Sequence, residues 1–141
     1  MQITYNLPQV FFDGSDRAEN SLVLRTLLDC LIHINLIYLQ LEASRGNVVP
    51  PLYRSGVIYG RTSWWEPIPA LYHRKFGDCK SLSAALIAEY RMKGIPCVPV
   101  HRWIPGNDGA THYHILVQVG DNKFEDPSRR LGMGKNENAY F

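Results

Sequence analysis

One stretch of this chain decides its fold: Gly77-Asp78-Cys79-Lys80-Ser81-Leu82-Ser83-Ala84-Ala85-Leu86-Ile87-Ala88-Glu89-Tyr90-Arg91. Asp78 is a favourable helix N-cap, and Gly94 just before Pro96 is a typical helix end, so we predict a helix over residues 79–93. Cys79 then occupies the first turn, where unpaired N–H groups and the positive end of the helix dipole favour a thiolate, the nucleophilic form of cysteine. The stretch therefore predicts a helix that presents a reactive thiol.

This helix is expected to pack on a small antiparallel sheet. Its apolar face consists of Leu82, Ala85, Leu86 and Met92. Three strands are predicted after it, over residues 97–103, 113–119 and 123–126, and Pro99 directs the first of them to a sheet edge. A helix followed by a short antiparallel sheet indicates an α+β fold.

Two polar side chains of the predicted sheet match the thiol chemically. His114 lies on the middle strand, and Asp126 lies at the end of the last one. Cysteine, histidine and carboxylate form a nucleophilic triad in which the imidazole moves the proton and the carboxylate orients the imidazole. His112 shares a strand face with His114, because strand side chains alternate, so it is an alternative base or a substrate contact.

The N-terminal part predicts a long helix. After turn and N-cap residues at 13–16, apolar side chains recur with mostly helical spacing from Leu22 to Ile34. The pattern over residues 32–42 partly alternates and also fits a strand, although we favour helix.

Residues 44–72 are rich in glycine and proline, which predicts a loop-rich segment packed on the domain. Within it, Trp64 and Trp65 lead toward Cys79. Their large amphipathic rings either line a substrate groove or cap the core.

Length and composition indicate one ordinary globular domain spanning residues 1–141. Hydrophobic residues make up 45% of the chain and charged residues 20%, and the net charge is +2, which is too small for a general nucleic-acid footprint. The three cysteines have no metal-binding spacing and cannot all pair, which indicates a reducing environment. The N-terminus lacks signal-peptide features, and polar residues interrupt the apolar region 21–41, so we predict neither a signal peptide nor a membrane span.

The motifs around Cys79, His114 and Asp126 resemble those of the transglutaminase-like family. The resemblance covers roughly residues 76–128. It rests on Gly77-Asp78-Cys79 at the helix start, Gly94-Ile95-Pro96 at the helix exit, the strand beginning at His114, and Asp126-Pro127-Ser128. It implies a papain-like α+β fold, with Cys79 as nucleophile, His114 as general base and acid, and Asp126 orienting the imidazole.

The chain departs from the family pattern at two points. Ile115-Leu116 replaces the usual Ala-Trp pair, and the upstream aromatic residue that stabilises the oxyanion has no firm counterpart. The backbone N–H of Cys79 is one expected oxyanion donor, and Trp64 or Trp65 is a candidate for the second. Zinc bound by Cys79, His112 and His114 is an alternative for which no fourth ligand is visible, so we expect no metal and no cofactor.

The resemblance implies cysteine-dependent acyl transfer on amide bonds of a protein or peptide, either as a protease, peptidase or amidase or by transamidation. The segment 124–133 also resembles bacteriophage and prophage versions of the family. The alternative function is therefore a virion-associated structural or assembly protein that uses the fold as a binding module for phage structural proteins. The expected location is the host cytoplasm or the virion.

Overall fold

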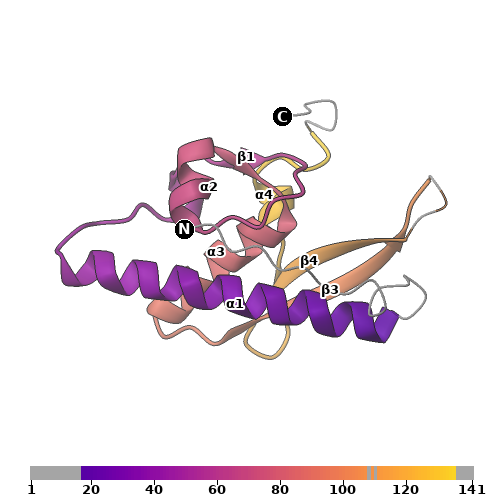
Figure 1. The fold of residues 1–141 in the computed structure, drawn as a ribbon, viewed down its shortest axis with the longest axis horizontal. Coiled ribbons are helices and arrows are strands. Elements are labelled where there is room, and N and C mark those ends of the chain that lie inside the picture. The colour runs from indigo at the N-terminus through magenta and orange to yellow at the C-terminus, as the bar shows by residue number, and fades with distance from the viewer. Residues whose placement is uncertain (1–16, 108, 110, 136–141) are drawn as a thin grey trace.

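A computed structural model describes residues 17–107, 109 and 111–135. The predicted turn residues 13–16 lie outside the described part of the chain. Figure 1 shows the helices gathered beside a twisted sheet. The elements follow in the order α1 (Arg17–Ser44), η2 (Leu52–Arg54), β1 (Ile58–Tyr59), α2 (Ile68–Arg74), β2 (Phe76–Gly77), α3 (Cys79–Met92), β3 (Cys97–Pro105), β4 (Thr111–Val119), β5 (Lys123–Glu125) and α4 (Pro127–Arg130). This mixture confirms the predicted α+β class.

Helix α3 forms the centre of the fold and begins where the sequence predicts. The side chain of Asp78 caps it by accepting a hydrogen bond from the Lys80 N–H at 3.2 Å. At its other end Gly94 adopts a left-handed conformation with φ 73°, which glycine reaches without steric cost. Every residue from Cys79 to Ala88 is buried, because α1, η2 and β4 all pack against the helix. The prediction of an apolar face was wrong only at Met92, which is exposed in the last turn.

Helix α1 runs alongside α3 (Figure 1). It is helical through residues 32–42, so the alternating pattern there does not produce a strand. One side contributes Leu28 and Ile32 to the core, whereas another side exposes apolar residues. The exposed ones are Leu22, Ile34, Ile37 and Leu41.

The stretch Asn20–Ser44 of α1 is long and apolar enough to cross a membrane by length and composition alone. Arg25 and Asp29 lie within it, and charged side chains are costly in a bilayer. Leu28 and Ile32 of the same stretch are fully buried against the rest of the domain. We predicted no membrane span, and one helix in the described part of the chain is nevertheless long and apolar enough to form one. The core helix of a soluble protein can have the same length and composition.

The main sheet has the strand order β3-β4-β5, and both pairs are antiparallel. Pro99 lies on the edge strand β3, as predicted, because a proline cannot donate a ladder hydrogen bond. In β4 the side chains of Ile115 and Val117 are fully buried in the core. The hydroxyl of Ser83 on α3 donates a hydrogen bond to the Ile115 carbonyl at 3.2 Å, which fixes the helix against this strand.

The segment 44–72 contains more regular structure than its composition predicts. Helix α2 has Pro67 as its N-cap and Pro69 in its first turn, where the missing N–H costs nothing. Strand β1 pairs in parallel with β2, placing Tyr59 beside Gly77. This short pairing brings a segment from the N-terminal half next to the start of α3.

Candidate active site

Cys79 is the first residue of α3, and its side chain is only 8% exposed. Gly77, two residues before the thiol, is closely packed: a methyl group in place of its hydrogen would lie 2.5 Å from Leu71 Cδ1, so any larger residue there would displace the buried Leu71 side chain. The motif Gly-Asp-Cys combines close packing, a helix cap and a candidate nucleophile in three consecutive residues.

The side chain of Lys80 is buried on the other side of Cys79. Its ammonium group pairs with Asp78 and donates a hydrogen bond to the Thr62 carbonyl at 3.0 Å. Burial raises the pKa of Asp78 although the neighbouring Lys80 opposes that shift. The Lys80–Thr62 bond holds the segment that precedes α2 against the first turn of α3.

His114 on β4 and Asp126 after β5 are brought together as the sequence predicts. His114 Nε2 lies 2.9 Å from Asp126 Oδ2. The antiparallel turn between β4 and β5 makes this contact possible over a separation of only 12 residues. The two side chains are mostly buried, at 14% and 19% exposed, so water screens their interaction weakly.

Cys79 completes the arrangement from α3. The hydrogen bond that the ring makes to Asp126, and then the one that it makes with Cys79, raises the pKa of His114 to about 9, against the opposing effect of burial. Because Nε2 contacts Asp126, Nδ1 is the ring nitrogen left to bond the thiol. Asp126 and His114 are thus in direct contact, and Cys79 contributes to the raised pKa of the same ring. The triad roles of these three side chains stay a prediction.

Asp126 is held by both of its carboxylate oxygens. Oδ2 binds His114, and Oδ1 accepts a hydrogen bond from the Arg129 N–H at 3.1 Å as the N-cap of α4. Burial raises the pKa of this carboxyl, but the hydrogen bonds from His114 and Arg129 outweigh burial and lower the pKa. An ionised Asp126 therefore faces a protonated His114 at neutral pH.

This pair has a consequence for stability. The folded-state pKa of His114, about 9, lies above the ordinary value of 6.5, so the folded protein binds this proton more tightly than the unfolded chain. We expect the resulting stabilisation, on the order of 2 kcal/mol, to be complete below pH 6.5 and lost as the pH rises through about 9. Urea unfolding at pH 6, 7.5 and 9 measures it. His114→Gln is the control, and an equal loss of stability with pH in that variant would contradict the assignment.

His112 is exposed and lies on the same strand, two residues from His114. The carboxylate of Asp126 contacts His114, which supports the choice of His114 as the base. Among residues 17–107, 109 and 111–135, no group of three or more His, Cys, Asp or Glu side chains is arranged to hold a metal ion. The role of His112 as a substrate contact stays a prediction.

The two tryptophans make different contacts. Trp64 is 51% exposed, and the Arg74 guanidinium stacks 3.8 Å from its ring centre. The ring of Trp65 lies 5.7 Å from Lys80 Nζ, so this side chain is held close to the residue that follows Cys79. Their assignment as oxyanion donors stays a prediction.

Two tyrosines near Cys79 were missed by the sequence analysis. Burial, and then the charge of Cys79, raises the pKa of both Tyr59 and Tyr113. Tyr113 precedes His114 in the chain and contacts Trp103 edge to face. The β1–β2 pairing brings Tyr59 to this region. This pairing could not be predicted, because strands of two residues leave no recognisable pattern in the sequence.

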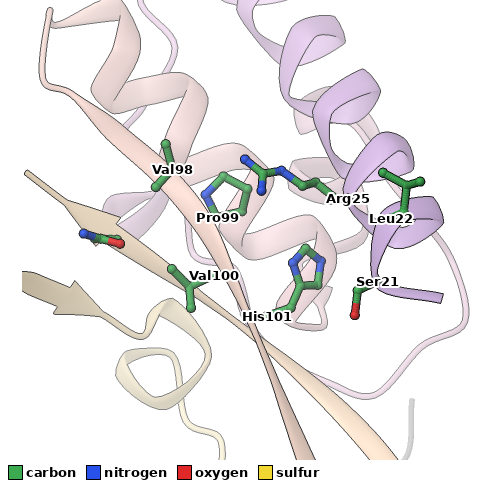
Figure 2. Close-up of a pocket in the computed structure, with 8 residues that line it drawn as sticks. Ser21, Leu22, Arg25, Val98, Pro99, Val100 and His101 are labelled. Carbon is green, nitrogen blue, oxygen red and sulfur yellow. The ribbon is translucent and has the colours of Figure 1, made fainter. Parts of the chain in front are cut away.

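A separate cavity of about 560 Å³ lies between α1 and β3. Figure 2 shows Arg25 of α1 and His101 of β3 lining it from facing elements. Burial, and then the charge of Arg25, lowers the pKa of His101, so its imidazole is neutral at pH 7. Cys79, His114 and Asp126 do not line this cavity, and it is not part of the candidate site.

Comparison with known proteins adds no further support for any assignment. No protein-family model, curated protein or solved structure shows a significant match to this chain.

Proposed function

We propose that this protein is a cysteine-dependent hydrolase or acyltransferase that acts on amide bonds of a protein or peptide. The observation that supports it is the 2.9 Å contact between Asp126 and His114, together with the raised pKa of His114, to which Cys79 at the N-terminus of α3 contributes. A carboxylate that raises the pKa of an imidazole beside a thiol favours transfer of the thiol proton to that imidazole.

The chemistry follows from this proton arrangement. The Cys79 thiolate attacks the carbonyl carbon of the amide, and the His114 imidazolium protonates the leaving amine as the C–N bond breaks. Water, or a second amine, then loses a proton to His114 and attacks the thioester, which regenerates the thiol. Asp126 holds the ring in the required orientation throughout.

Two donors near Cys79 suit a developing oxyanion. The Asp78 cap is directed to the Lys80 N–H, and we assign the backbone N–H of Cys79 to the oxyanion. The second donor that we infer is the Tyr59 hydroxyl. Arg61 donates a hydrogen bond to this phenol, which leaves the phenolic proton available for the substrate. Trp64 and Trp65 are the alternatives for this second donor, and the Trp65 ring lies 5.7 Å from Lys80 Nζ.

The accessibility of the three cysteines gives a direct test. Cys30 is exposed, whereas Cys79 and Cys97 are buried, and burial raises the pKa of Cys97. Exposure alone therefore predicts that iodoacetamide modifies Cys30 first. We expect the reverse at pH 6: peptide mapping should find Cys79 modified fastest, because only an ionised thiol reacts. Faster modification of Cys30 at this pH would reject the proposed function.

A binding role is the second candidate. The exposed apolar residues of α1, which include Ile34, Ile37 and Leu41, favour contact with another protein. In this alternative the domain is a virion-associated module that binds phage structural proteins, and Cys79→Ser leaves the binding unchanged. The two functions are compatible in one protein.

A further inference from the structure

The carboxylate of Glu125, the residue before Asp126, is bound by side chains from three other elements. Its Oε1 accepts a hydrogen bond from the Tyr53 hydroxyl and its Oε2 accepts one from the Tyr90 hydroxyl, both at 2.6 Å. Arg130 lies 3.2 Å from Oε1 and also stacks 3.8 Å from the centre of the Tyr53 ring. The Glu125 side chain is only 14% exposed, so these charge-assisted bonds are short and poorly screened.

These contacts of Glu125 join parts of the chain that carry different members of the triad. Tyr90 belongs to α3, the helix that begins with Cys79, whereas Glu125 ends β5 and leads directly to Asp126. Tyr53 belongs to η2, which is itself tied to α3 because Glu89 accepts a hydrogen bond from the Leu52 N–H at 2.9 Å. The carboxylate of Glu125 therefore fastens the end of β5 to the helix of the nucleophile.

Strand β5 needs such a fastening. It has three residues, it lies at the edge of the sheet, and it pairs only with β4, from Val119↔Lys123 to Val117↔Glu125. Asp126 comes after the last of these pairs, at the point where the ladder no longer holds the chain. Its position relative to α3 then depends on its own bonds to His114 and Arg129 and on the contacts of its neighbours.

We propose that Glu125 is a positioning residue for the triad, which acts by holding Asp126, and through it His114, at the correct distance from Cys79. This inference rests on the proposed function. The two tyrosines remain donors over the working pH range, because burial, and then the hydrogen bond to Glu125, raises the pKa of each phenol. The hydrogen bonds from Tyr53 and Tyr90 to Glu125 therefore do not depend on pH near neutrality, whereas the His114–Asp126 pair that they position does titrate.

The test compares the pH dependence of Cys79 alkylation by iodoacetamide in the wild type and in Glu125→Gln. Glutamine keeps the shape of the side chain but offers only one acceptor oxygen, so one tyrosine loses its partner. We expect the rate at pH 6 to fall about threefold to tenfold and the midpoint of the pH profile to rise by up to about one unit. Glu42→Gln is the matched control, since Glu42 also accepts bonds on both oxygens, from Arg45 and Asn47, on α1.

The double variant Tyr53→Phe/Tyr90→Phe distinguishes the effect of the hydrogen bonds to Glu125 from the effect of the Glu125 charge. It also keeps the inference testable if Glu125→Gln does not fold. It removes both hydroxyl donors and keeps the Glu125 carboxylate, so a positioning role predicts the same shift of the pH profile. A shift in Glu125→Gln alone would mean that the charge acts directly, and the inference would be wrong. A lower melting temperature with an unchanged pH profile would also overturn it, because that is the signature of a purely structural contact.

Failure of the inference and failure of the proposed function give different results. If the wild-type Cys79 reacts slowly at pH 6, the proposed function fails, and the inference fails with it. If the wild-type thiol reacts rapidly and both sets of variants behave like the wild type, only the positioning role of Glu125 is rejected.

Discussion

Replacing His114 by Ala should slow the alkylation of Cys79 at pH 6 by about 100-fold. An ordinary thiol with a pKa of about 8.5 is only about 0.3% ionised at that pH, whereas a thiolate paired with an imidazolium is mostly ionised. The pairing is supported by the raised pKa of His114, to which both Asp126 and Cys79 contribute. The measurement is the rate of modification at each cysteine, followed by peptide mapping between pH 5 and 9.

The shape of the profile is as informative as the rate. The His114→Ala variant should approach the wild-type rate near pH 9, where even an unassisted thiol is largely ionised. Cys30 supplies an internal control, since it is exposed and distant in sequence from the site. A similar decrease at Cys30, or a rate at Cys79 that does not depend on His114, would contradict the thiolate–imidazolium pair. His112→Ala distinguishes the second candidate base and should leave the rate near that of the wild type.

The second large effect is expected at Asp126. Removing its carboxylate in Asp126→Ala breaks the 2.9 Å contact with His114 and the cap of α4 together. A buried charge-assisted hydrogen bond is worth about 1.5–3 kcal/mol, so the rate of Cys79 alkylation at pH 6 should fall about tenfold to 100-fold. The lost cap adds about 1 kcal/mol of destabilisation, which thermal unfolding would detect.

Asp126→Asn separates these contributions. Asparagine has one acceptor oxygen, which can keep the bond from the Arg129 N–H that caps α4, but its NH2 group then faces the His114 ring and the charge that holds the proton on the imidazole is lost. We expect stability close to that of the wild type, with a rate between those of the wild type and Asp126→Ala. If Asp126→Ala reacts at the wild-type rate while remaining folded, the carboxylate does not orient the imidazole.

The residues near Cys79 could be predicted because short-range signals specify them. Asp78 and Gly94 mark the two ends of α3, and the turn after β4 forces the strand of His114 and the end of β5 to lie side by side. Each of these features depends on interactions over a few residues. Helix α2 was missed because Pro67 and Pro69 indicate a loop in sequence, although proline also fits a first helical turn.

The surroundings of the triad could not be predicted in the same way. Tyr59 reaches Cys79 through a parallel pairing of two-residue strands, and no local pattern distinguishes such strands from loop. Tyr53 and Tyr90 converge on Glu125 across 72 and 35 residues of sequence. These contacts depend on how the helices pack on the sheet, which is a property of the assembled core.

The near-complete burial of Cys79 places a demand on the shape of any substrate. Only 8% of the residue is exposed, so a substrate must bring its carbonyl carbon to a largely covered side chain. A peptide in extended form, or a chain end, could bring its carbonyl carbon to such an atom, whereas an amide in the middle of a folded helix or sheet could not. The enzyme that we propose would therefore select for polypeptide segments that are already unfolded or protruding, whatever the side chains of the substrate.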